Sequence, residues 1–273
     1  MAVVNALTVD FEDWYQGIEI PCEAWEGYES RIERSGRRLL SILERAQVRA
    51  TFFVLGWIAE RYPALVGEIV AQGHEIATHG WSHSLVYRLT PETFRDELKR
   101  SLRALEGLAG RPVLGHRAPY FSITRDSLWA LPILQEEGLI YDSSVFPVSN
   151  YRYGIPDAPR WPYRIREEGR GLQEFPITTW RVLGRNLPVA GGAYFRIFPY
   201  LVTRTAFASV NREGHPAVFY IHPWEVDPEH PRPPLPRRIA LPHYANLDRT
   251  APRLERLLRD FQFAPMREVL GVA

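Results

Sequence analysis

The sequence predicts an α/β fold built on a mostly parallel sheet. Short apolar, β-branched runs alternate with amphipathic helical patterns up to about residue 145. Strands that alternate with helices of this length form right-handed βαβ units. Such folds gather reactive groups at the carboxyl ends of their strands, and Asp10, His79 and His222 each fall where a predicted strand ends.

The predicted elements follow this alternation along the chain. Strands are predicted at residues 3–10, 49–55, 74–79, 139–146 and 216–222, and helices at about 35–47, 63–72, 91–107, 199–211 and 251–263. The helix at 91–107 has the clearest pattern, because Thr90 can cap it and Pro91 suits its first position. Phe94, Leu98 and Leu102 then mark one apolar face.

Composition and charge exclude several classes of function. The chain has 273 residues, a single cysteine (Cys22) and a formal net charge of +1. This balance gives no electrostatic case for binding nucleic acid or an anionic membrane, and one cysteine excludes an internal disulfide framework. No secretory leader pattern and no run of about 20 apolar residues is found. We therefore expect a cytoplasmic enzyme without an integral membrane segment and of open oligomeric state.

Carboxylates and histidines are placed as in a catalytic metal site. Asp10, Glu12 and Asp13 follow the first predicted strand, where they repel one another unless a cation or an arginine compensates. His79 and His83 are four residues apart and can converge on one ion at a strand-to-helix turn. Taken alone, the acidic cluster is equally well explained as a solvated turn, and the histidine pair is slightly better explained as two hydrogen-bonded loop residues. Together they predict a metal bound by two histidines and one carboxylate, with positions open for water or substrate.

Two further residues suit the same chemistry. Arg117, in the segment GHRAPYFS, would lower the pKa of nearby carboxylates and fix their orientation. His222 ends an apolar strand and can act as a general acid across a pocket from a carboxylate base. Between about residues 148 and 200 the chain is rich in Pro, Trp, Tyr and Gly, which predicts long surface loops that carry substrate contacts.

In this order the motifs resemble the polysaccharide deacetylase family (carbohydrate esterase family 4, with NodB homology). The matching segments are the acidic motif after the first strand, TFFVLG, HGWSH, RAPY and a late strand that ends in histidine. Residues 10–14, 191–196 and 220–227 resemble the subfamily encoded with PEP-CTERM/exosortase systems. The resemblance covers nearly the whole chain and implies one domain with the fold of a distorted (β/α) barrel. Its core would comprise about 1–147 and 213–227, with a loop-rich insertion at about 148–212 and a C-terminal extension at about 228–273.

The resemblance also implies a role for each catalytic residue. Asp10 is similar to the general base, and Arg117 to the residue that orients it. His222 is similar to the general acid, but the family's fourth motif is not clearly present, so its partner stays open. Tyr120 matches the residue whose backbone N–H stabilises the oxyanion.

The implied cofactor is a divalent metal held by His79, His83 and one acid. Zinc is the expected ion, with cobalt, nickel and manganese as alternatives. The usual first motif has two adjacent aspartates, whereas here Phe11 follows Asp10. The acidic ligand is therefore open between Glu12 and Asp13.

The implied activity is removal of N-acetyl groups from amino sugars of a bacterial exopolysaccharide or its precursor. The alternatives are hydrolysis of a cyclic amide of the allantoin type and carbohydrate binding without catalysis. Aromatic side chains of the loops, Trp161 and Trp180 among them, suit stacking on sugar rings. The substrate contacts that we expect are Trp81, Pro119, Tyr194, Phe195, Arg196 and Trp224.

Overall fold

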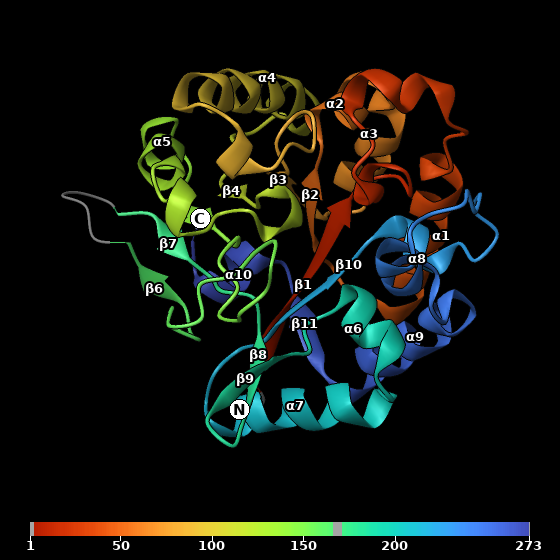
Figure 1. Cartoon of the computed structure of the whole chain (residues 1–273), viewed down its shortest axis with the longest axis vertical. Helices are drawn as coiled ribbons and strands as arrows, with labels where there is room; N and C mark the ends of the chain where they lie inside the picture. Colours follow the sequence, from red (N-terminus) through yellow and green to blue (C-terminus); the bar gives the residue numbers. More distant parts are fainter. Residues whose placement is uncertain (1–2, 166–170, 273) are drawn as a thin grey trace.

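The computed structural model of the chain describes residues 3–165 and 171–272 and has a nine-stranded sheet that curls into a partial barrel (Figure 1). The strand order is β10-β1-β2-β3-β4-β5-β7-β6, and β11 also pairs with β1. Within the described ranges every pairing in this sheet is parallel except that of β6 with β7. The α/β class with a mostly parallel sheet is therefore confirmed. The strands are β1 (Val4–Phe11), β2 (Thr51–Val54), β3 (Glu75–Thr78), β4 (Gly115–His116), β5 (Tyr141–Asp142), β6 (Tyr163–Arg164), β7 (Gln173–Glu174), β10 (Val218–Ile221) and β11 (Gln262–Ala264).

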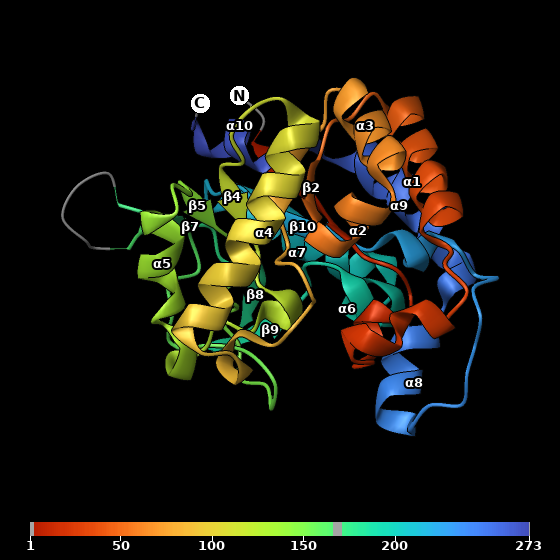
Figure 2. The ribbon, with the colours of Figure 1, turned by 90° about the horizontal axis from the view of Figure 1, so that it is seen from above.

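Helices surround the sheet, and Figure 2 shows both chain termini on the side opposite to α8. The helices are α1 (Ile32–Ala46), α2 (Gly56–Arg61), α3 (Pro63–Ala71), α4 (Pro91–Ala109), α5 (Ala130–Glu136), α6 (Gly192–Ile197), α7 (Tyr200–Arg212), α8 (Arg237–Tyr244), α9 (Thr250–Asp260) and α10 (Met266–Leu270). The predicted cap of α4 is confirmed, because the Thr90 hydroxyl accepts the N–H of Thr93 at 3.2 Å. None of the helices in the described ranges combines the length and apolar character needed to cross a bilayer.

The stretch from 148 to 200 is more regular than predicted. It contains β6 and β7, which extend the main sheet, and a separate hairpin of β8 (Thr179–Val182) and β9 (Arg185–Pro188). These strands have two to four residues each, which is too short to show a period in the sequence. Helix α8 and strand β11 were also missed, since α8 contains a proline and β11 has three residues.

The alternation of β1 directs its side chains to two different environments. Leu7 and Val9 pack in the larger apolar core, whereas Thr8 and Asp10 face the inside of the curled sheet. Strands β1, β3, β4 and β10 run parallel, so their carboxyl ends meet at one rim. The residues at or just after these ends build the site described next.

Candidate functional site

Glu12, His79 and His83 form a buried cluster that could hold a metal ion. Each offers one ligand atom, and these atoms lie within 4.8 Å of one another. Nε2 of His83 lies 2.5 Å from Oε2 of Glu12, an oxygen that makes no hydrogen bond with any described residue. Nδ1 of His79 donates to the carbonyl oxygen of Arg117 at 2.7 Å, which leaves Nε2 as a lone-pair donor. Two imidazoles and one orphaned carboxylate oxygen fit a divalent cation with open positions.

The turn between the two histidines explains how both rings reach the cluster. Gly80 follows β3 with a φ of 76°, and His83 itself has a φ of 56°. A left-handed conformation costs a residue other than glycine roughly 1–2 kcal/mol. The imidazole rings of His79 and His83 then lie 5.2 Å apart. Backbone strain at this position is typical of functional sites, where surrounding contacts hold it in place.

The protonation states in the cluster suit metal binding. Burial, together with the neighbouring His83, lowers the pKa of His79 to about 4, so its ring is neutral at pH 7. Burial alone would raise the pKa of Glu12, but His83 and His222 lower it to about 2. A neutral imidazole and an ionised carboxylate are the forms that ligate a metal.

Asp13, the other carboxylate that the sequence left open, does not fit as a ligand. Its oxygens accept the backbone N–H groups of Trp14 (2.9 Å), Arg31 (2.9 Å) and Ile32 (3.1 Å), and the Ser30 hydroxyl at 2.7 Å. A carboxylate that binds N–H groups at the start of α1 caps that helix and favours its dipole. Glu12, and not Asp13, is the acid that lies against the two histidines.

Arg117 holds one carboxylate oxygen of Asp10. Its guanidinium is fully buried and donates at 2.7 Å to Oδ1 of Asp10 and to the hydroxyl of Thr8. Its Nε and Nη2 donate to the carbonyl oxygen and the hydroxyl of Ser143, both at 3.0 Å. Oδ1 of Asp10 is thus held, and Oδ2 is directed toward the pocket, 3.9 Å from Nε2 of His222.

The segment after β5 supports this arginine. Ser144 accepts the backbone N–H of Ala118 at 2.8 Å and donates to Asp142 at 2.7 Å. Nδ1 of His116 lies 2.7 Å from the same carboxylate. His116 is itself a fully buried residue of β4. The YDSS segment therefore fixes the RAPY segment from the neighbouring strand end.

Glu225 is the partner of His222 that sequence reasoning missed. Its Oε1 lies 2.7 Å from Nδ1 of His222 and accepts the backbone N–H of the same residue at 3.0 Å. Nε2 of His222 faces the pocket, 3.7 Å from Oε1 of Glu12. Burial would lower the pKa of His222, but Glu12 and Glu225 raise it to about 9, so the ring is protonated at pH 7. The pair is a local capping box at η6 (Pro223–Val226), and the HPWE spacing is the pattern from which it could have been found.

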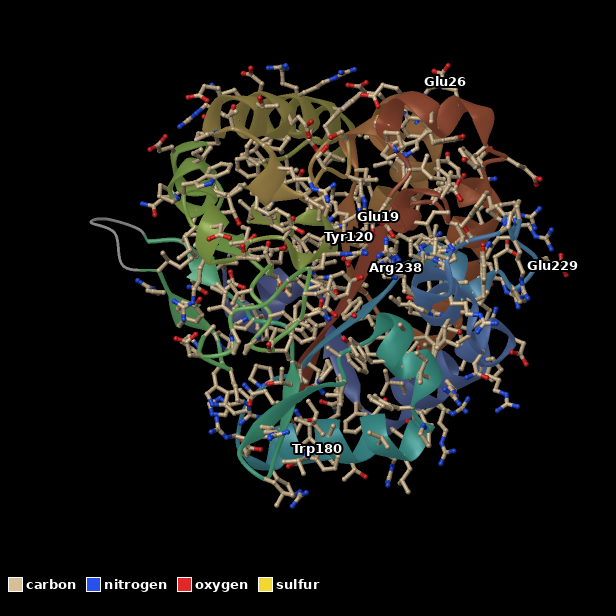
Figure 3. The ribbon with its side chains drawn as sticks, in the orientation of Figure 1. Glu19, Glu26, Tyr120, Trp180, Glu229 and Arg238 are labelled. Atoms are coloured by element: carbon tan, nitrogen blue, oxygen red, sulfur yellow. The ribbon has the colours of Figure 1, made fainter. Side chains whose placement is uncertain are left out.

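The metal cluster, Asp10 and His222 line one pocket of about 320 Å³. Helix α8 forms one wall, and the loop at residues 150–153 forms another. Figure 3 labels two residues that line the pocket, Tyr120 and Arg238. The pocket-lining residues beyond the metal cluster include Asp10, Tyr120, Phe121, Tyr153, Tyr194, Arg196, Tyr220, His222, Trp224, Ile239 and His243.

The GGAYFR segment reaches the pocket because of its first glycine. Gly191 has a φ of 150°, and a Cβ at this position would lie 1.8 Å from the carbonyl oxygen of Tyr220. Only glycine permits this approach to β10, which brings α6 alongside the strand that ends at His222. Of the predicted substrate contacts, Tyr194, Arg196 and Trp224 line the pocket. The Trp224 indole also donates to Glu12 at 3.3 Å.

Three predicted substrate contacts lie outside this pocket. Trp81 lines a neighbouring cleft and is covered by the Arg100 guanidinium, 3.6 Å from its ring centre. Pro119 lines a small cavity behind the site. Phe195 is fully buried against Phe219, with ring centres 4.9 Å apart. All three lie apart from the pocket that contains the metal cluster, and their role as substrate contacts stays a prediction.

Two aromatic loop residues are also placed away from the reactive groups. Trp161 stacks on His215 with ring centres 3.9 Å apart. Trp180 belongs to β8 and lies beside α7, far from Tyr120 in Figure 3. Neither is among the residues that line the pocket.

Comparison with known families agrees with this arrangement. Residues 26–135 match the family model described as polysaccharide deacetylase. The chain carries a polysaccharide deacetylase domain. Residues 143–271 match a second model, described as a domain of unknown function (DUF3473). The first match contains the HGWSH and RAPY segments, and the second contains His222 and α8.

Relatives of the deacetylase domain are similar over part of their length. The chain is 34% identical over 110 residues to a peptidoglycan deacetylase-like protein of Gibberella zeae, and 36% identical over 91 residues to a chitooligosaccharide deacetylase of Bradyrhizobium sp.. These segments are 40% and 33% of this chain, and the chain spans only 32% and 42% of those proteins.

A solved structure confirms the fold of the deacetylase domain and its C-terminal part. The crystal structure of a candidate polysaccharide deacetylase from Mycobacterium smegmatis superposes with a TM-score of 0.61 at 21% identity. The superposition covers 99% of this chain and 94% of that chain. The predicted distorted (β/α) barrel is confirmed.

Proposed function

We propose that the protein is a divalent-metal-dependent hydrolase that removes N-acetyl groups from amino sugars of a bacterial exopolysaccharide or its precursor. The observation that carries the proposal is the joint placement of the Glu12, His79 and His83 cluster with Asp10 and His222 in one pocket. The deacetylase relatives support the reaction class. The choice of glycan rests on the resemblance of residues 191–196 and 220–227 to the subfamily encoded with PEP-CTERM systems.

The proposed reaction uses a base and an acid on the two sides of the cluster. A divalent cation held there supplies Lewis acidity and lowers the pKa of a water bound to it. Asp10 accepts a proton at Oδ2 as the water oxygen bonds to the acetyl carbonyl carbon, while Arg117 holds the other oxygen. The backbone N–H of Tyr120 is the proposed donor to the oxyanion.

Collapse of the tetrahedral intermediate breaks the C–N bond. His222 donates the proton at Nε2 to the departing nitrogen, since Glu225 retains the ring orientation through Nδ1. The products are acetate and the free amino sugar. Asp10 and His222 are 3.9 Å apart, so one substrate amide can contact both.

Acetate release from N-acetylglucosamine oligomers tests this function directly. Protein loaded with zinc, cobalt, nickel or manganese should release acetate, and chelator-treated protein should not. Parallel assays with allantoin would reveal the cyclic-amide alternative, and glycan binding without turnover would reveal the non-catalytic one. Metal content is measured on the same samples. Absence of acetate from every N-acetylated glycan, with metal shown to be bound, would falsify the proposal.

A further inference from the structure

Arg196 is a buried arginine whose contacts join two parts of the site. It is 1% exposed, and its Nε donates at 2.5 Å to Oε2 of Glu225. The other nitrogens donate to the carbonyl oxygens of Pro242 (2.6 Å), His243 (2.9 Å) and Ala245 (2.9 Å). A buried guanidinium needs a counterion and hydrogen-bond partners; Glu225 is the counterion, and the four acceptors engage all three nitrogen atoms of the side chain.

The three carbonyl groups belong to the end of α8, the helix that forms one wall of the pocket. The last carbonyls of a helix lack intrahelical donors and carry its negative dipole end, so an arginine binds them well. Helix α8 has eight residues and contains Pro242, and its preceding segment, 228–236, is rich in proline. A helix this short with an internal proline is marginal by itself. Its seat over the pocket therefore depends on tertiary contacts such as those of Arg196.

Glu225 connects this anchor to His222. One carboxylate oxygen faces Arg196, and the other faces Nδ1 and the backbone N–H of His222. The carboxylate is fully buried, so it cannot exchange either partner for bulk water. Among the described residues, Arg196 and His222 are the two ion-pair partners of Glu225. Displacement of α8 would free the Arg196 guanidinium, and Glu225 would then keep only His222 as a partner.

We propose that Arg196 is a positioning residue that couples the seating of α8 over the pocket to the orientation of His222. The inference rests on the proposed function for the role of His222 but not for the contacts themselves. With α8 seated, Arg196 holds Glu225, and Glu225 directs Nε2 of His222 toward Asp10 and Glu12. A catalytically competent acid is then formed only when the wall of the pocket is closed.

The coupling is tested from both ends with Arg196→Met and Glu225→Gln. In the full-length, metal-loaded protein, Arg196→Met should lower kcat at saturating substrate by roughly 10- to 100-fold, a fraction of what a general acid contributes. Glu225→Gln keeps the side-chain shape but removes the ion pair. It should speed amide hydrogen exchange of residues 237–245 by on the order of tenfold, because their anchor is loosened.

Arg196→Lys distinguishes a role as counterion of Glu225 from a role as hydrogen-bond donor that anchors α8. Lysine keeps the positive charge beside Glu225, but its ammonium lacks the planar fork that reaches three carbonyl groups at once. We expect neither the kcat nor the slow exchange of α8 to be restored. Recovery of both by Arg196→Lys would reduce Arg196 to a counterion and overturn the coupling.

Arg253→Met is the matched control. Its NH1 donates to the carbonyl oxygens of Phe195 (2.9 Å), Arg196 (2.8 Å) and Phe198 (3.1 Å), so it also anchors a helix end, that of α6. Within the described ranges it has no hydrogen bond or ion pair with Glu225 or α8. The kcat of Arg253→Met and its rate of amide hydrogen exchange in α8 should stay within about twofold of the parent values. A twofold ratio corresponds to less than about 0.5 kcal/mol, since RT is about 0.6 kcal/mol.

Different results would refute the link between Glu225 and α8 and the effect of Arg196 on His222. Unchanged α8 exchange in Glu225→Gln would refute the link whatever the enzyme does. A kcat for Arg196→Met equal to that of Arg253→Met would refute the effect on His222. A parent protein that releases no acetate would refute the proposed function, while the exchange experiment would still decide whether Glu225 anchors α8.

Discussion

Loss of the Arg117 side chain should destabilise the fold, because it leaves the buried Asp10 carboxylate without its counterion. Both side chains are at most 3% exposed, and Arg117 donates to Asp10, Thr8 and Ser143. Removing one partner of a buried ion pair leaves a charge without compensation and costs about 3–5 kcal/mol. We therefore expect Arg117→Met to lower the free energy of unfolding by that amount. Adding Asp10→Asn removes the orphaned charge and should return about 2 kcal/mol of it.

Urea denaturation at pH 7 measures these free energies, in the presence of a chelator so that no cation neutralises Asp10. Arg100→Met is the comparison, because Arg100 makes a two-pronged pair with Glu60 at 2.8 Å in an exposed setting. That exposed pair should be worth no more than about 1 kcal/mol. An Arg117→Met loss equal to the Arg100→Met loss, or additive losses in the Asp10→Asn double variant, would refute the reasoning.

Three other predictions address the metal cluster and the stability of the fold. His79→Ala or His83→Ala should abolish both metal binding and acetate release, whereas Asp10→Asn should still bind metal but lose turnover. Elemental analysis and the acetate assay measure the two properties. Loss of metal in Asp10→Asn would instead identify Asp10 as a metal ligand. The neutral His74 ring accepts the Ala50 N–H at 3.1 Å, and burial lowers its pKa from 6.5 to about 4. Its stabilisation is therefore complete above pH 6.5 and is lost as the pH falls toward 4, by up to about 3 kcal/mol; the free energy of unfolding of His74→Asn should show a correspondingly smaller slope over that range. Thr90→Ala should cost about 1 kcal/mol through loss of the α4 cap, and an unchanged urea midpoint would contradict it.

The positions of the reactive residues were predictable because they depend on strand ends. Asp10, His79 and His222 end or follow runs of apolar residues, and the carboxyl ends of parallel strands meet at one rim. Their hydrogen-bond partners were harder to foresee. Glu225 and Asp13 are both acids near the site, and the structure shows that Glu225 supports His222 while Asp13 caps α1; the HPWE spacing pointed to the first contact, but nothing in the sequence pointed to the second.

Residue type alone did not separate pocket walls from packing. Tyr194 and Phe195 are adjacent aromatic residues of α6, yet the first lines the pocket and the second is fully buried. Successive residues of a helix point about 100° apart, and a helix of six residues is too short to show which face is covered. The PEP-CTERM subfamily, the cytoplasmic location and the identity of the metal stay predictions.

The late strands β10 and β11 pair with opposite edges of β1, and this has a consequence for synthesis of the chain. Val4 to Ala6 pair with residues 262–264, and Ala6 to Val9 pair with residues 218–221. A ribosome adds about 5–20 residues per second, so the edge of β1 that pairs with β10 stays unpaired for on the order of ten seconds or more. Throughout that interval an apolar strand with free N–H and C=O groups is open to the wrong partner. We expect nascent chains that lack residues beyond 217 to need chaperone protection.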